Sequence, residues 1–134
     1  MEQSSTPAQK VLIVEDNFDF AKIYRDMLSD RGYEVYYAEN GESGLTMAKE
    51  HKPDAILLDL ILPKMSGYDV LKAVREDANI KDTPVIIFSV MGDQAEMKKA
   101  FELGADDFST KGFARPAEIF AKIDKVILQR KTKK

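Results

Sequence analysis

The sequence predicts an α/β domain in which helices cover both faces of a doubly wound, five-stranded parallel sheet. Apolar runs alternate with amphipathic segments along the chain, which is the pattern of βαβ units. Two of these runs, residues 11–14 and 55–58, are apolar throughout, as expected for strands buried on both faces of a parallel sheet. The length of 134 residues suits a single domain.

The first apolar run predicts a strand at Lys10–Val14, and a helix is expected to follow at Phe18–Asp30. One stripe of that helix is apolar at helical spacing: Phe20, Ile23, Tyr24, Met27 and Leu28. Gly32 stops the helix, and a second strand is predicted at Glu34–Ala38.

A second helix is capped by Asn40 and ends before Pro53. The solid apolar run Ala55–Leu58 predicts the third strand. The third helix is expected at about residues 66–76, with three side chains turned inward: Val70, Leu71 and Val74.

The fourth strand is predicted at Val85–Ser89, and the fourth helix spans about residues 94–103 before Gly104. A short fifth strand follows at residues 107–109. The fifth helix opens at Pro116, a favourable first helical position. Its apolar stripe contains Ile119, Phe120, Ile123, Val126 and Ile127.

Right-handed crossovers and the sheet order 2-1-3-4-5 are expected, with strands one and three adjacent at the switch point. This order places Glu15, Asp16 and Asp59 side by side where open α/β sheets bind ligands. Such carboxylates repel one another unless a hard cation lies among them, and Mg²⁺ favours carboxylate oxygens together with phosphate. The sequence therefore predicts a protein that carries a phosphoryl group on Asp59.

The composition excludes several other classes of protein. No Cys is present, which rules out disulfides and thiolate metal sites, and the net charge of -3 gives no general nucleic-acid signal. No apolar run approaches the roughly 20 residues that span a membrane, and the polar N-terminus lacks a signal-peptide pattern. A cytoplasmic protein without membrane contact is expected. We expect a flexible segment at 1–9, the domain at 10–129 and a basic tail at 130–134.

Over residues 11–127 the chain resembles the response-regulator receiver domains of two-component signalling. The matching motifs are Val-Glu-Asp-Asn at 14–17, Leu-Asp-Leu-Ile-Leu-Pro at 58–63 with Gly67, Pro-Val-Ile-Ile-Phe-Ser ending at Ser89, and Gly-Ala-Asp-Asp-Phe-Ser-Thr-Lys at 104–111. Each motif is weak alone, but their order and spacing together are specific. The resemblance implies the flavodoxin-like fold.

The resemblance also implies a role for each site residue. Asp59 is the phosphoacceptor, since carboxylates form acyl phosphates. Glu15, Asp16, Asp59 and the backbone carbonyl of Ile61 would hold Mg²⁺. Lys111 would pair with Asp59 or its phosphate. Three of these residues are carboxylates, which suits a cation that keeps several waters and takes few protein oxygens.

Ser89 and Phe108 match the family's switch positions. Ser89 would donate a hydrogen bond to a phosphoryl oxygen while Phe108 swings inward. The changed surface would comprise the fourth helix, fifth strand and fifth helix, around Lys98, Phe108 and Lys122. A change of charge at one site biases such a two-state element.

The implied partners are a histidine kinase or histidine phosphotransfer protein as donor and a downstream protein as target. No sequence remains for an output domain, so we expect a stand-alone, chemotaxis-regulator-like receiver or a piece of a longer protein. It would be a monomer or a weak phosphorylation-dependent dimer. Activity would be limited to self-phosphorylation from a phosphodonor and slow self-dephosphorylation.

The chain departs from the family pattern around the phosphate. Gly112 replaces the usual Pro after Lys111, and a cis bond before Gly would cost ~2.5–4 kcal/mol, so a trans bond and a looser loop are expected. Val90 stands where a smaller residue is common and would narrow access. Ile61 and Met91 are apolar and orient no water, so slow loss of the phosphate is expected.

Two rival functions remain open on the sequence. A dehalogenase-type phosphohydrolase with an Asp nucleophile needs a carboxylate two residues later, where this chain has Ile61. A phosphorylation-independent interaction module on the same fold would not need Asp59 and Lys111. A flavin carrier is disfavoured because no Ser/Thr/Gly-rich phosphate loop follows the first strand. His51, the only His, is expected to be a surface residue and not a phosphoryl donor.

Overall fold

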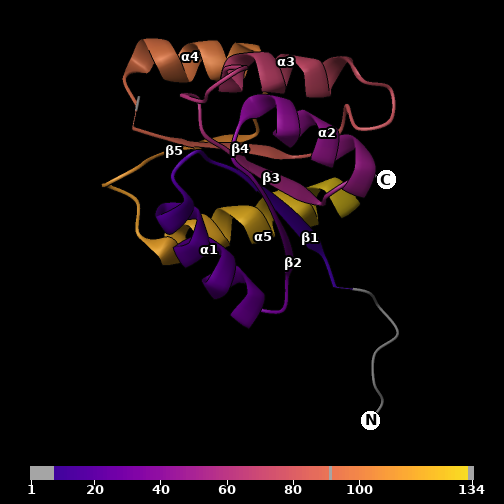
Figure 1. Ribbon diagram of the computed structural model, residues 1–134, viewed down its shortest axis with the longest axis vertical. Helices are drawn as coiled ribbons and strands as arrows, with labels where there is room; N and C mark the ends of the chain where they lie inside the picture. The colour runs from indigo at the N-terminus through magenta and orange to yellow at the C-terminus, as the bar shows by residue number, and fades with distance from the viewer. Residues whose placement is uncertain (1–7, 91, 133–134) are drawn as a thin grey trace.

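The computed structural model describes residues 8–90 and 92–132, which form one parallel sheet between two layers of helices (Figure 1). The sheet order is β2-β1-β3-β4-β5, as the sequence predicts. The strands are β1 (Lys10–Val14), β2 (Glu34–Ala38), β3 (Ala55–Leu58), β4 (Val85–Ser89) and β5 (Asp107–Thr110). Only β5 differs from its predicted bounds: it ends one residue later, because Thr110 still pairs with Ser89 of β4.

The helices are α1 (Phe18–Asp30), α2 (Gly41–His51), α3 (Gly67–Glu76), α4 (Gln94–Glu102) and α5 (Pro116–Thr132). Four of them begin at a polar side chain that accepts a hydrogen bond from the first turn: Asn17, Asn40, Ser66 and Asp93. Ser66 and Leu103, expected inside α3 and α4, are the residues that cap these helices.

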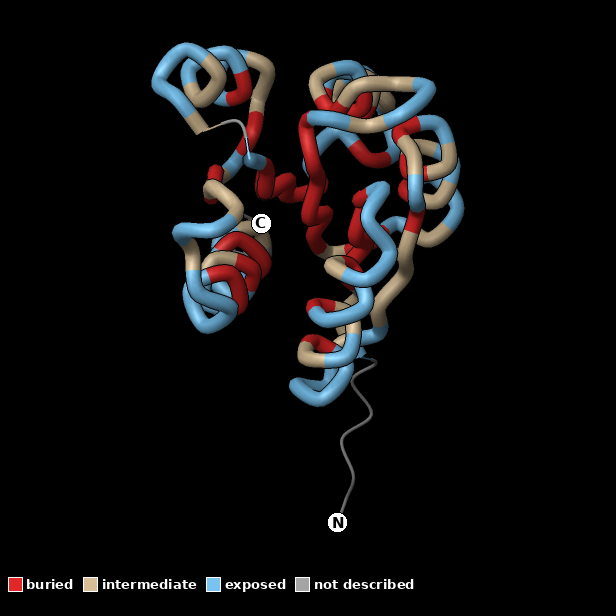
Figure 2. The backbone as a smooth tube through the Cα atoms, turned by 60° about the vertical axis from the view of Figure 1, so that its left-hand side comes forward, coloured by how far each residue is buried: buried red, intermediate tan, exposed pale blue. Residues whose placement is uncertain are grey.

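Helices α2, α3 and α4 cover one face of the sheet, and α1 and α5 cover the other (Figure 1). Buried residues concentrate in the strands between these layers, and the sides of the helices that face away from the sheet are exposed (Figure 2). The predicted inward residues of α3 and α5 are all buried. In α1, however, Ile23 is 53% exposed, because Ala21 takes the inward position beside Tyr24 and Leu28.

Gly67 fixes the start of α3 against the strand that carries Asp59. A Cβ atom at Gly67 would lie 2.1 Å from the carbonyl oxygen of Asp59, so only glycine permits this approach. The Gly67 N–H donates to the carbonyl of Leu60 at 2.9 Å. The glycine therefore holds the loop after β3 in place behind the Asp59 side chain.

The expected terminal segments lie partly outside the described residues. Residues 1–7 of the N-terminal segment and residues 133–134 of the basic tail are not described, while α5 continues through Thr132. Among the described residues, every helix is too short or too polar to cross a lipid bilayer.

Candidate functional site

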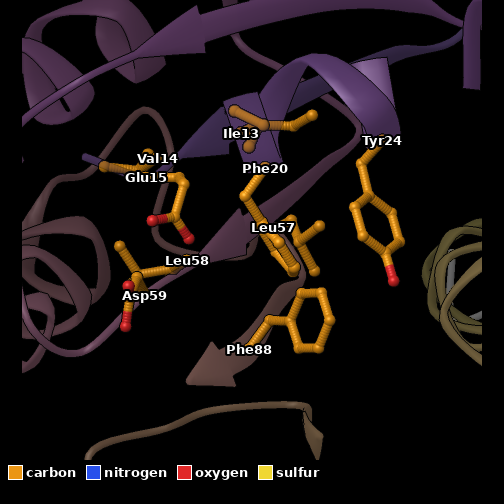
Figure 3. A pocket seen from close by; sticks show the side chains of 10 residues that line it. Ile13, Val14, Glu15, Phe20, Tyr24, Leu57, Leu58, Asp59 and Phe88 are labelled. Atoms are coloured by element: carbon orange, nitrogen blue, oxygen red, sulfur yellow. The ribbon is translucent and has the colours of Figure 1, made fainter. Parts of the chain in front are cut away.

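Three carboxylates meet at the carboxyl end of the sheet. Glu15 and Asp16 follow β1 and Asp59 follows β3, and these strands are neighbours in the sheet. One oxygen atom from each carboxylate lies within 4.8 Å of the others. Figure 3 shows the side chains of Glu15 and Asp59 close together at the ends of their strands. Both are buried, while Asp16 is exposed.

Backbone hydrogen bonds fix the positions of Glu15 and Asp59 at the ends of their strands. The Asp59 N–H donates to the carbonyl of Val14, and the Glu15 N–H donates to the carbonyl of Ala38, each at 3.0 Å. These bonds continue the sheet ladder one residue beyond the strands. The two acidic side chains are thus placed by rigid backbone rather than by a loose loop.

Backbone N–H groups also orient the carboxylates. The Asn17 N–H donates to Glu15 Oε2 at 3.0 Å, and the Ile61 N–H donates to Asp59 Oδ1 at 3.2 Å. Tyr37 donates its hydroxyl to the Glu15 carbonyl at 2.7 Å. Each bond favours the observed orientation of its acceptor.

Lys111 reaches into the acidic cluster from the end of β5. Its Nζ lies 2.9 Å from Asp59 Oδ2 and also donates to Glu15 Oε1. The backbone N–H of Lys111 donates to the Ser89 carbonyl at 2.9 Å, and its bond to Gly112 is trans, as expected from the sequence. The structure therefore brings Lys111 to Asp59 and adds Glu15 as a second partner, which the sequence analysis missed.

Burial and charge oppose each other at these groups. Burial raises the pKa of the Glu15 carboxyl, against the lowering effect of the hydrogen bonds from Lys111 and Asn17. Burial alone would lower the pKa of the Lys111 ammonium, but its hydrogen bonds to Glu15 and Asp59 outweigh burial and raise the pKa. The ammonium is therefore held in its charged form by its neighbours.

The cluster suits a hard divalent cation. Its donor set is three carboxylates, and oxygen ligands of this kind are those that Mg²⁺ prefers. One ammonium faces three carboxylates, so negative charge remains to be neutralised. The residues present therefore fit the Mg²⁺ expected from the sequence.

The residues expected to act as a switch are both buried. Ser89 ends β4 and is fully buried, and Phe108 on β5 is 5% exposed. The Phe108 ring belongs to the core beneath α2, α3 and α4, so it lies inward in this structure. Lys122 on α5 donates to the Phe108 carbonyl at 2.8 Å and to Ser109 Oγ at 2.6 Å.

Apolar side chains rim the site. Ile61 is 49% exposed and Val90 is 64% exposed, each in the loop after its strand. Met91, the third apolar residue expected there, lies outside the described residues. His51 lies away from this site, at the C-terminal end of α2. Its ring stacks on that of Tyr36, with 4.0 Å between the centroids.

Comparison with known proteins gives one consistent family. The model of the response regulator receiver domain matches residues 11–124. A probable transcriptional regulator, ycf27, of Guillardia theta is 40% identical over 125 residues, which are 93% of this chain and 47% of that protein. The chain thus spans about half the length of the curated relatives it matches.

Solved receiver domains share the fold closely. That of a putative LuxO repressor protein from Vibrio parahaemolyticus has a TM-score of 0.87 at 29% identity, covering 94% of this chain and 95% of its own. That of the sensor histidine kinase PA1611 from Pseudomonas aeruginosa has a TM-score of 0.81 at 28% identity, covering 90% and 98%. In the latter, a magnesium ion is coordinated in the active site cleft.

Proposed function

Because this chain belongs to the response regulator receiver domain family, we propose that Asp59 is its phosphoacceptor, loaded by a histidine kinase or a histidine phosphotransfer protein. Receiver domains are signalling modules of two-component systems and not enzymes in their own right. The observation that carries the proposal is the position of Asp59, which pairs with the Lys111 ammonium and lies within one cluster with Glu15 and Asp16. An isolated buried carboxylate has no such arrangement of charges.

The chemistry assigns one step to each residue. A carboxylate oxygen of Asp59 attacks phosphorus, the new O–P bond forms, and the P–N bond to the donor imidazole breaks. Lys111 follows the negative charge from the carboxylate to the phosphoryl oxygens, and Ser89 donates a hydrogen bond to one of them. Glu15, Asp16, Asp59 and the Ile61 carbonyl would hold Mg²⁺, whose charge offsets that on the transferred group.

Signalling would follow from the added charge. The phosphoryl group of an acyl phosphate carries roughly -1.5 to -2 charges, which replace the single negative charge of the Asp59 carboxylate. Ser89 and Lys111 would then shift toward it, and the surface of α4, β5 and α5 around Lys98, Phe108 and Lys122 would change. Lys122 already donates a hydrogen bond to the backbone of Phe108, so a shift of β5 would be transmitted to α5.

We assign the receiver part to protein contacts and not to nucleic-acid binding, in line with its net charge of -3. Relatives that are named transcriptional regulators are about twice as long as the matched region. Its own chemistry would be limited to self-phosphorylation from small phosphodonors and slow hydrolysis of the acyl phosphate. Association would be absent or weak and dependent on phosphorylation.

Acetyl phosphate with Mg²⁺ tests the phosphoacceptor directly. Intact mass should rise by one phosphoryl group in the wild-type chain and remain unchanged in Asp59→Asn. Asp82→Asn is a matched control, since Asp82 is an exposed carboxylate in the loop before β4, and it should be labelled like the wild type. Equal labelling of Asp59→Asn would remove Asp59 as the nucleophile.

A further inference from the structure

The face of an aromatic ring lies beside the Lys111 ammonium. Lys111 Nζ is 4.7 Å from the centroid of the Phe20 ring. The Lys111 side chain is only 13% exposed, so water screens this contact little. A ring face carries partial negative charge, and its attraction for an ammonium grows as the ammonium is desolvated. Phe20 is therefore an electrostatic neighbour of the site as well as a part of the core.

The ring completes the surroundings of the ammonium without competing for a strong hydrogen bond. An ammonium has three N–H donors, and Glu15 and Asp59 accept from it. Phe20 adds a negative surface that has no oxygen atom. The ring attracts the charge of Lys111, and the N–H donors of the ammonium remain free to change acceptor.

Phe20 is held in place by other aromatic residues. Its ring centroid is 5.2 Å from that of Tyr24 and 5.4 Å from that of Phe88. In Figure 3 its side chain extends from α1 between the Glu15 carboxylate and the Tyr24 ring. A cavity of about 10 Å³ lies among these side chains, which is room for one water at most. The ring has little space to turn away from the ammonium.

We propose that Phe20 is a positioning residue for phosphoryl transfer, which acts by holding the Lys111 ammonium at the site through its ring face. The proposal rests on the proposed function of Asp59. When Asp59 becomes an acyl phosphate, its negative charge moves to the phosphoryl oxygens. Lys111 must then leave the carboxylate while Glu15 still attracts it. A non-directional attraction to Phe20 keeps the ammonium within reach of both acceptors during this exchange.

Fluorination of the Phe20 ring separates its electrostatics from its packing. Fluorine withdraws electron density from the ring face and changes the volume little. Phenylalanines with one, two and three fluorines at position 20 should lower the rate of phosphorylation by acetyl phosphate stepwise. We expect about a threefold to tenfold fall over the series, with Phe20→Leu at least as slow and Phe20→Tyr near the wild type. Saturating Mg²⁺ and intact-mass time courses give the rates.

Phe88 provides the matched control. Its ring lies in the same aromatic cluster, and none of the described cations lies over it. Fluorination at Phe88 should leave the rate unchanged, and melting temperatures should be alike in both series. A flat rate over the Phe20 series, or an equal slope at Phe88, overturns the role of Phe20 and leaves Asp59 as phosphoacceptor. A wild-type chain that takes no phosphoryl group overturns the role of Phe20 together with the proposed function.

Discussion

At the scale of single residues, the side chains around Asp59 divide into buried charges and exposed apolar groups. Glu15 and Asp59 are buried, and both pair with Lys111, whose side chain is 13% exposed. Ile61 and Val90 stand outside them and are exposed. Neither offers a group that would hold a water in line with an acyl phosphate. We therefore expect that a phosphoryl group on Asp59 persists.

Ile61→Asn should shorten the life of the phosphorylated form. A side-chain amide at position 61 can orient an attacking water, and each tenfold gain in rate corresponds to ~1.4 kcal/mol. We expect decay that is faster by up to about tenfold. The side chain is half exposed, so the fold should tolerate the change. Loss of the phosphoryl group after removal of the phosphodonor measures the rate of decay.

Ile61→Val is the control for that experiment, because it changes the size of the side chain and keeps it apolar. Its decay should match the wild type. Decay in Ile61→Asn that is equal to or slower than in the wild type would show that water access at position 61 does not limit hydrolysis.

At the scale of elements, Arg75 on α3 ties together the loops at the amino end of the sheet. Its guanidinium donates to the Gly104 carbonyl through Nε at 3.0 Å and through Nη2 at 2.8 Å. It also reaches the carbonyls of Lys81 and Thr83 at 3.0 and 2.7 Å and pairs with Asp106 at 2.8 Å. One side chain thus joins α3 to the segments before β4 and β5.

Arg75→Met should lower the free energy of unfolding by about 2–3 kcal/mol, because it leaves several carbonyl groups without their charged donor. The free energy of unfolding of Arg75→Lys should lie between those of Arg75→Met and the wild type, since an ammonium lacks the planar fork of donors. Urea unfolding curves measure both. Lys72→Met on the exposed face of the same helix is the control and should change stability by less than about 0.5 kcal/mol. Similar losses for the variants at 75 and 72 would show that these hydrogen bonds contribute little.

At the scale of the whole molecule, the acidic cluster links the stability of the fold to divalent cations. Three carboxylates gather at one edge only when β1 and β3 pair, so the unfolded chain has no comparable site. A ligand that binds the native state alone stabilises it by mass action. Folding and cation binding are therefore coupled.

Mg²⁺ should raise the melting temperature, with a gain of about 1.4 kcal/mol for each tenfold increase in its concentration above Kd. Asp16→Ala should abolish this gain, because it removes one of the three carboxylates. Without Mg²⁺ the variant should be at least as stable as the wild type, since it has less repulsion and Asp16 is exposed. Differential scanning calorimetry with and without MgCl₂ measures both.

Sodium chloride at matched ionic strength controls for screening of exposed charges. Sodium chloride should leave the difference in melting temperature between the wild type and Asp16→Ala unchanged. An equal Mg²⁺-dependent rise in Asp16→Ala would place the cation elsewhere.

Local sequence signals determined most of the fold of this chain. The apolar runs of β1, β3 and β4, the Gly32 stop of α1 and the Asn40 cap of α2 lie within short stretches, so the bounds of these elements could be predicted within a residue. The alternation of strands and helices predicted a doubly wound parallel sheet, and the order expected for it is the one observed. The placement of Asp59 beside Glu15 and Asp16 followed from that order alone.

The tertiary structure decided what depends on distance through space. Lys111 and Glu15 are 96 residues apart, and no local pattern says that their charges meet. The contact of Phe20 with that ammonium, and the exposure of Ile23 one turn away, depend on how α1 sits on the sheet. A helical stripe tells which side chains are apolar, but only the packing of the helix against its neighbours determines which of them reach the site.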